Sequence, residues 1–188
     1  MSAKEMTGVP QRGASTLWIM LLTAASAVTT LALACATPFP ALAALAAVHM
    51  RRRDGVALVL AAWLASQVVG FCIHDYPRDL ETAGWAVGLA TAAVASVLGA
   101  YGAIARTARL PAWLKLAAAY VSAFIAFKLA VLVWAIWLGG VEMAFAPGVV
   151  MRQFVRDAAI LAGLMMLYRA MTAIGVPAVT SRTRTRAA

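Results

Sequence analysis

The segment GFCIHDYPRD, residues 70–79, lies between two long apolar runs and decides how the chain divides into helices. From Cys72 to Asp79 it brings together a thiol, an imidazole, a phenol, a guanidinium and two carboxylates. The runs on either side consist mainly of Ala, Leu and Val. Because such polar groups are rare within membrane-embedded helices, the segment is predicted to be a loop that joins two of them. The same segment is the first candidate for a ligand-binding or catalytic site.

The composition is typical of a membrane protein. Of the 188 residues, 64% are hydrophobic and 12% are charged, against about 25% charged in an average soluble domain. Folded in water, such a chain would leave much apolar surface exposed, so the bilayer is its expected solvent. The net charge of +9 comes from short segments between the apolar runs and from the tail. That distribution argues against nucleic acid as a partner.

A proline-containing break divides the first apolar run. As one helix, residues 17–50 would be about 50 Å long, whereas the hydrocarbon core of a bilayer is about 30 Å thick. The sequence TPFP at 37–40 ends the helix, because proline removes backbone donors and restricts the residue before it. We therefore expect a first span at 17–36 and a short second span at 39–50, for which a re-entrant segment is the alternative.

Four further spans complete the expected all-α fold. They are predicted at residues 56–73, 83–105, 112–138 and 149–171. The predicted architecture is a six-helix transmembrane bundle that forms a single domain, residues 17–175. A disordered cytoplasmic segment (1–16) precedes this domain, and a basic cytoplasmic tail (176–188) follows it.

The distribution of basic residues orients the bundle. Cytoplasmic loops of membrane proteins carry an excess of Lys and Arg, and the basic clusters here fall in alternate connections, at 51–53, 106–115 and 182–186. The opposite loops, which hold Asp79 and Glu142 among others, have no positive excess. Both termini are therefore expected in the cytoplasm and loop 74–82 outside it. A five-span alternative changes only the side of the amino terminus.

Charged residues are also predicted inside the last two spans. Lys128 and Asp157 each lie about 15 Å below the outer surface at helical rise. Because an unpaired charge at that depth is costly, they are expected to form a structural pair; the alternative is that one of them meets a polar substrate. Arg152 and Arg156 share a helix face. They are expected either to reach lipid phosphates or to hold an anionic or amide-rich ligand.

Cys72 has three competing interpretations. It could form a disulfide with Cys35 on the oxidising side of the membrane. It could instead be buried as a small apolar residue. The third interpretation is a nucleophile or metal ligand, whose thiolate form would be stabilised by His74 or Arg78 nearby.

The metal chemistry open to this loop is restricted. Cys72, His74 and Asp75 are too clustered to close a tetrahedral zinc site easily. A soft thiolate suits a metal that arrives already held in a macrocycle and needs one axial ligand. Phe71 and Tyr76 would then supply flat apolar surface. No Walker motif is present, so the chain has no expected ATP site.

The chain resembles a known family of vitamin transporters. A protein of 19.7 kDa with six apolar spans, basic cytoplasmic loops and Ala-x-x-x-Ala stripes at 43–47 and 57–65 resembles the substrate-binding S-components of energy-coupling-factor transporters. Cys72 at the outer end of the third span, followed by Tyr76, is similar to the BtuM-type cobalamin transporters. These are solitary bacterial proteins that resemble S-components but have no dedicated energising module.

The resemblance implies a location, a ligand and a role for the cysteine. The location would be the bacterial inner membrane, and the ligand would be cobalamin, vitamin B12. Cys72 would coordinate the cobalt axially and assist removal of cyanide from cyanocobalamin, with Tyr76 beside the corrin ring. An energising module as partner is not evident from the sequence.

The first hypothesis is therefore import of a corrinoid. Cys72 would bind the cobalt and displace or reductively remove its upper ligand (reductive decyanation), while Phe71 and Tyr76 lie against the ring. Four polar residues are the candidates for contacts with the ligand's side-chain amides or phosphate: His74, Asp75, Arg152 and Arg156.

Two alternatives use other residues. One is a membrane thiol-redox or assembly protein, in which Cys35 and Cys72 exchange disulfides with partners outside the cytoplasm. The other is a transporter of a different small polar solute, with Lys128 and Asp157 as its coupling site.

Overall fold

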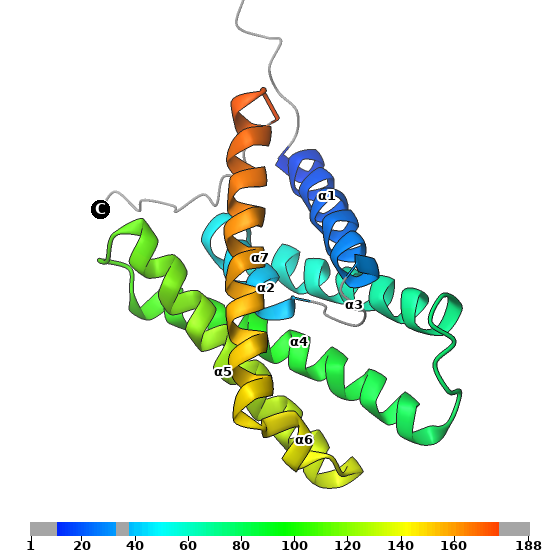
Figure 1. The fold of residues 1–188 in the computed structure, drawn as a ribbon. Coiled ribbons are helices and arrows are strands. Elements are labelled where there is room, and N and C mark those ends of the chain that lie inside the picture. The colour runs from blue at the N-terminus through cyan, green and yellow to red at the C-terminus, as the bar shows by residue number, and fades with distance from the viewer. Residues whose placement is uncertain (1–10, 33–37, 177–188) are drawn as a thin grey trace, which may run out of the picture.

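The computed structural model describes residues 11–32 and 38–176, and all regular structure within them is helical. In chain order the helices are α1 (Gln11–Ala32), α2 (Phe39–His49), α3 (Arg52–Cys72), α4 (Leu80–Arg106), α5 (Ala112–Leu138), α6 (Val141–Phe145) and α7 (Pro147–Ala173). The predicted all-helical class is confirmed for this part of the chain (Figure 1). Each span predicted after residue 38 coincides with a helix, with ends that differ by at most four residues.

The predicted number of six membrane spans is not confirmed. Among the described residues, three helices are long and apolar enough to cross a membrane: α3, α4 and α5. Helix α2 has 11 residues and measures about 16 Å. Helix α7 has 27 residues, but it carries four charged side chains, those of Arg152, Arg156, Asp157 and Arg169. The structure thus supports a membrane protein, with α6 as a short helix that the hydropathy pattern did not reveal.

The beginning of α1 differs from the prediction. Residues 1–16 are predicted to be disordered, yet α1 begins at Gln11. The hydroxyl of Ser15 donates a 2.6 Å hydrogen bond to Oδ2 of Asp54, in the first turn of α3. This long-range contact fixes a polar segment that hydropathy alone would leave outside the domain. Residues 1–10 and the tail from 177 onward lie outside the described residues.

Helix α2 is the centre of the fold. It packs against α3, α4, α5 and α7, and Figure 1 shows it behind α7. Its residues from Phe39 to Ala47 are all buried. Pro40 lies in the first turn, where its missing N–H costs no intrahelical bond. The predicted short second span is therefore enclosed by protein on several sides, which explains how a helix of only 11 residues is accommodated.

A tyrosine from α4 contacts the carboxyl end of α2. The Tyr101 hydroxyl lies 3.0 Å from the carbonyl oxygens of both Ala46 and Met50, and the Ala46 oxygen also accepts the Met50 backbone N–H at 2.7 Å. Gly55 leaves room for this contact, because a Cβ atom there would lie 2.7 Å from the Tyr101 hydroxyl oxygen. The end of the buried helix is thereby fixed to α3 and α4.

Small residues bring α4 and α5 together. A Cβ atom at Gly88 would lie 2.8 Å from the Trp134 ring, and one at Gly99 would lie 2.7 Å from the backbone oxygen of Ser122. The indole N–H of Trp134 also donates to the Thr91 hydroxyl at 2.8 Å. Close approach through small residues is the usual way in which helices associate in lipid. It makes α4 and α5 a rigid antiparallel pair.

The connection from α5 to α7 determines where the buried charges lie. Gly139 and Gly140 have φ angles of 89° and 90°, which side chains disfavour, and they end α5. Helix α6 follows, and Pro147 then starts α7, which turns back, contacts α5 through Phe154 and crosses α2 (Figure 1). This hairpin brings Lys128 of α5 and Asp157 of α7 into one region of the molecule.

Candidate functional site

The loop after α3 folds back over the end of its own helix. The amide N–H of Tyr76 donates to the Gly70 carbonyl at 3.2 Å. A Cβ atom at position 70 would lie 2.7 Å from the Tyr76 ring, so glycine is required for this close packing. Asp75 has a φ angle of 49°, in the left-handed region that aspartate tolerates better than most residues. The sequence from 70 to 76 therefore specifies a tight, ordered turn.

Asp79 ends this turn and begins α4. Its Oδ1 atom accepts a 2.7 Å hydrogen bond from the backbone N–H of Thr82, the usual role of an aspartate at a helix N-cap. The hydrogen bond from the Thr82 backbone is the main cause of a lowered pKa for the Asp79 carboxyl. Asp79 thus has a structural role in positioning the loop, and the candidate ligand-binding groups are other residues.

Cys72 is the last residue of α3, with an exposed, free thiol. The interpretation of Cys72 as a buried apolar residue is therefore wrong for the structure. The disulfide interpretation depends on Cys35, which lies outside the described residues. The third interpretation, a thiol available for ligation or nucleophilic attack, agrees with the exposure of Cys72.

Two aromatic side chains predicted to accompany the cysteine lie together beside it. The ring centroids of Phe71 and Tyr76 are 6.3 Å apart in an edge-to-face arrangement. The His74 ring is stacked on Tyr76 at 6.1 Å. Asp75 and Arg78 are exposed in the same loop. The loop therefore holds a small aromatic cluster close in sequence to the free thiol of Cys72.

A half-open pocket of about 100 Å³ lies between α3 and α4 under this loop. Its wall includes polar and aromatic side chains from both helices and the loop, namely Ser66, Gln67, His74, Tyr76, Thr82 and Trp85. Cys72 is not part of the wall. Since small-molecule pockets usually measure about 300–1,000 Å³, this one is too small to enclose a whole ligand of that kind.

Sequence reasoning did not identify the helical half of this pocket. Gln67 and Ser66 stand in an otherwise apolar run, and a polar pair near the end of a membrane helix was the available signal. The described residues also contain no group of three His, Cys, Asp or Glu side chains placed to hold a metal ion.

Lys128 is buried in the α5–α7 region. Its Nζ atom donates to the Ala144 carbonyl of α6 at 3.1 Å. The same atom lies 5.3 Å from the centroid of the Phe145 ring and 6.0 Å from that of Phe124, within the range of cation–π attraction. The ammonium group thereby connects α5 to the short helix that follows it.

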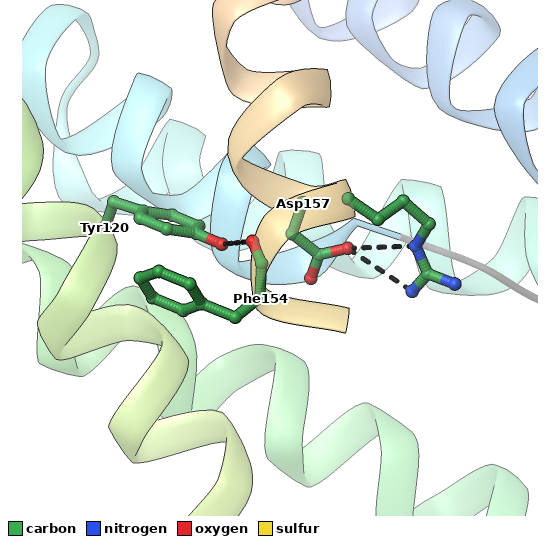
Figure 2. A network of polar contacts seen from close by, with 4 residues as sticks. Tyr120, Phe154 and Asp157 are labelled. Atoms are coloured by element: carbon green, nitrogen blue, oxygen red, sulfur yellow. Dashed lines mark hydrogen bonds and ion pairs between the residues drawn. The ribbon is translucent and has the colours of Figure 1, made fainter. Parts of the chain in front are cut away.

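Asp157 has no exposed surface, and it pairs with a residue that sequence reasoning assigned elsewhere. Its Oδ1 atom accepts from Nη2 and Nε of Arg156 at 3.3 and 3.4 Å (Figure 2). Its Oδ2 atom is buried and has no hydrogen-bond partner. The predicted direct pair with Lys128 is not formed: no ion pair joins the two within 4.0 Å. Each nevertheless acts on the other electrostatically.

The reason for this difference is local geometry. Arg156 precedes Asp157 in α7, and its long side chain reaches back to the carboxylate, while the α6 carbonyl offers Lys128 a nearer acceptor. Arg152, one turn earlier, is exposed. Figure 1 shows the α3–α4 loop at the edge of the molecule and α7 across its middle. The structure therefore does not bring Arg152 and Arg156 to Cys72, as a single corrinoid site that contains all three residues would require.

The chain matches no protein-family model, no curated protein and no solved structure. The assignment of a function therefore depends on the geometry of these two regions.

Proposed function

We propose that this protein binds a corrinoid at the extracytoplasmic end of a helical membrane bundle and imports it, with Cys72 as the axial ligand of cobalt. The excess of basic residues in the connections at 51–53 and 106–115 supports placing the α3–α4 loop outside the cytoplasm. The bacterial inner membrane is the corresponding location. Helices α3, α4 and α5 supply the membrane-crossing scaffold.

The observation that carries the proposal is the exposed free thiol of Cys72 at the end of α3. A corrinoid supplies its cobalt already held by the ring nitrogens, so the protein needs to provide one axial donor and no further metal ligand. A thiolate is a soft donor that suits such a centre. Exposure matters as well, because a buried sulfur could not approach a metal at the middle of a wide, flat ring.

The surroundings of Cys72 suit the rest of such a ligand. The edge-to-face rings of Phe71 and Tyr76 offer apolar contact to a flat macrocycle. The 100 Å³ pocket beside them, with Ser66, Gln67 and Thr82 in its wall, suits one side-chain amide of the ligand. The ring itself would rest outside this pocket, over the loop. Full enclosure of the ligand therefore requires the loop between α3 and α4 to move.

The proposed decyanation would proceed by ligand exchange at cobalt, without any redox step. The Cys72 thiolate donates an electron pair to cobalt, a sulfur–cobalt bond forms, and cyanide leaves with the electron pair of its own bond. Cobalt keeps its oxidation state. The reaction needs only the thiolate form of the cysteine.

The visible spectrum of bound cyanocobalamin tests the proposal. Purified protein incubated with cyanocobalamin should show a shifted corrinoid spectrum, because sulfur replaces the axial ligand. Cys72→Ser should abolish the shift, and Cys35→Ser, which removes the other cysteine, should retain it. A spectrum of the mixture identical to that of free cyanocobalamin would refute the role of the thiol. Loss of the shift in Cys35→Ser as well would favour the thiol-redox alternative.

A further inference from the structure

The corrinoid proposal does not use the buried charges of the α5–α7 region. Lys128 of α5 is 9% exposed and Asp157 of α7 is fully buried, and neither helix contributes to the wall of the pocket under the α3–α4 loop. Buried ionisable groups in a membrane domain are expensive to keep. Their arrangement therefore calls for a role other than loop chemistry.

The carboxylate of Asp157 is only half satisfied. Its contacts with Arg156, at 3.3 and 3.4 Å, are long for a charge-assisted hydrogen bond, and the Arg156 side chain is one-third exposed to the surroundings. The Oδ2 atom has no partner although it is completely enclosed. A charged carboxylate loses its hydration on burial, and with one oxygen unbonded most of that free-energy cost is not offset by new hydrogen bonds.

The other groups that face Asp157 do not supply the missing hydrogen bond. From α5, the Tyr120 hydroxyl donates to the Phe154 carbonyl (Figure 2), and the Lys128 ammonium donates to Ala144. From α7 itself, Arg156 reaches Oδ1 alone. Helix α2, which also packs against α7, is buried there through apolar side chains.

We propose that Asp157 is a proton-binding site of the membrane domain, and that its charge decides which partner Lys128 takes. A proton taken from water adds to Oδ2, so that the carboxylate becomes a neutral carboxyl group and no other bond breaks. With Asp157 neutral, the Lys128 ammonium has no anion to approach and remains on the Ala144 carbonyl, as in this structure. With Asp157 charged, the ammonium moves to the bare oxygen and releases α6.

The Lys128 side chain can move between the Ala144 carbonyl and the Asp157 carboxylate. An ammonium group has three donors on a flexible stem and can turn between two acceptors. The Phe124 and Phe145 rings at 6.0 and 5.3 Å support the cation in its present position. Proton loss at Asp157 would thus be transmitted to α6, in the connection between α5 and α7. A proton gradient could drive corrinoid import through this site; that extension rests on the proposed function, whereas the proton site does not.

Infrared spectroscopy of the protein in lipid nanodiscs, without corrinoid, tests the proton site directly. From about pH 5 to about pH 8, an aspartate in water, with a pKa near 3.9, is ionised. The wild type should nevertheless show a protonated-carboxyl band that disappears as the pH rises in this range. Asp157→Asn should remove the band and Asp157→Glu should keep a titrating one. Asp79→Asn, which alters an exposed carboxylate, should leave it unchanged.

A second variant separates a proton site from a structural charge. Lys128→Met removes the cation but keeps Asp157 in place, so the band should persist to a pH higher by about one unit or more. An absent or non-titrating band in the wild type would overturn the proposal. A band that survives in Asp157→Asn, or a titration unaffected by Lys128→Met, would overturn it too. Since no corrinoid is present, failure here is distinguishable from failure of the spectral test at Cys72.

Discussion

Replacing Gly99 by alanine should destabilise the protein, whereas the same replacement at Gly163 should not. At position 99 the new methyl group would lie 2.7 Å from the backbone oxygen of Ser122 and 2.9 Å from the Cβ atom of Ala126. A helix carbonyl cannot rotate away, so α4 and α5 must separate. At position 163 nothing lies within 4 Å of the added atom.

The expected size of the difference follows from two opposing effects. Alanine gains about 1 kcal/mol over glycine in a helix at either site, while overpacking at position 99 costs about 1–3 kcal/mol. The two variants should therefore differ in stability by about 1–3 kcal/mol. For a chain of this size that corresponds to a difference in Tm of roughly 2–12 °C.

Thermal unfolding in detergent, followed by circular dichroism, measures this difference. Gly102→Ala is the control within α4, because the nearest atom to its new methyl group is the far end of the flexible Arg106 side chain, at 3.2 Å. It should melt close to Gly163→Ala. Equal melting temperatures for all three variants would refute the claim that α4 and α5 are in backbone contact at Gly99.

Other positions offer shorter tests. Tyr101→Phe should lower the unfolding free energy by about 0.5–1.5 kcal/mol, because it removes the hydroxyl that bonds the Ala46 and Met50 carbonyls while Ala46 keeps its bond from the Met50 N–H; denaturant titration measures the loss. The Asp79 carboxyl has a lowered pKa, so its stabilising effect is present above the ordinary value of 3.8 and is lost as the pH falls through the lowered one. The difference in Tm between wild type and Asp79→Ala should accordingly vanish in acid. In a Cys35→Ser background, a membrane-impermeant maleimide should label Cys72 in intact cells and should fail to label the variant that also carries Cys72→Ser; protection of Cys72 would contradict the proposed orientation.

The positions of the helices could be predicted because their ends are marked by chemistry. The polar cluster at 70–79 and the Pro111 turn interrupt apolar runs, and the predicted fifth span coincides with α5. The short α6 could not be predicted, since five residues between two glycines and a proline carry too little periodicity. The enclosure of α2 also depends on how four other helices pack, which no local pattern contains.

The candidate site was predictable to a similar degree. The association of Phe71 and Tyr76 follows from residues close in sequence, whereas the sequence left the state of Cys72 open among three interpretations. The partner of Asp157 could not be foreseen in the same way. Helical depth placed Lys128 and Asp157 at a similar level, but the choice of Arg156 and Ala144 as partners depends on helix rotation and side-chain reach.

The capping of α2 by Tyr101 also constrains how the protein is made. The tyrosine whose hydroxyl contacts the Ala46 carbonyl is synthesised 55 residues later, after all of α3. Until then the end of α2 has no donor from α4, and its length of 11 residues is too short for stable insertion by a translocon on its own. Stable insertion of α2 into the bilayer therefore requires α4 to be synthesised first. A nascent chain truncated within α4 before Tyr101 would be a natural substrate for membrane quality-control proteases.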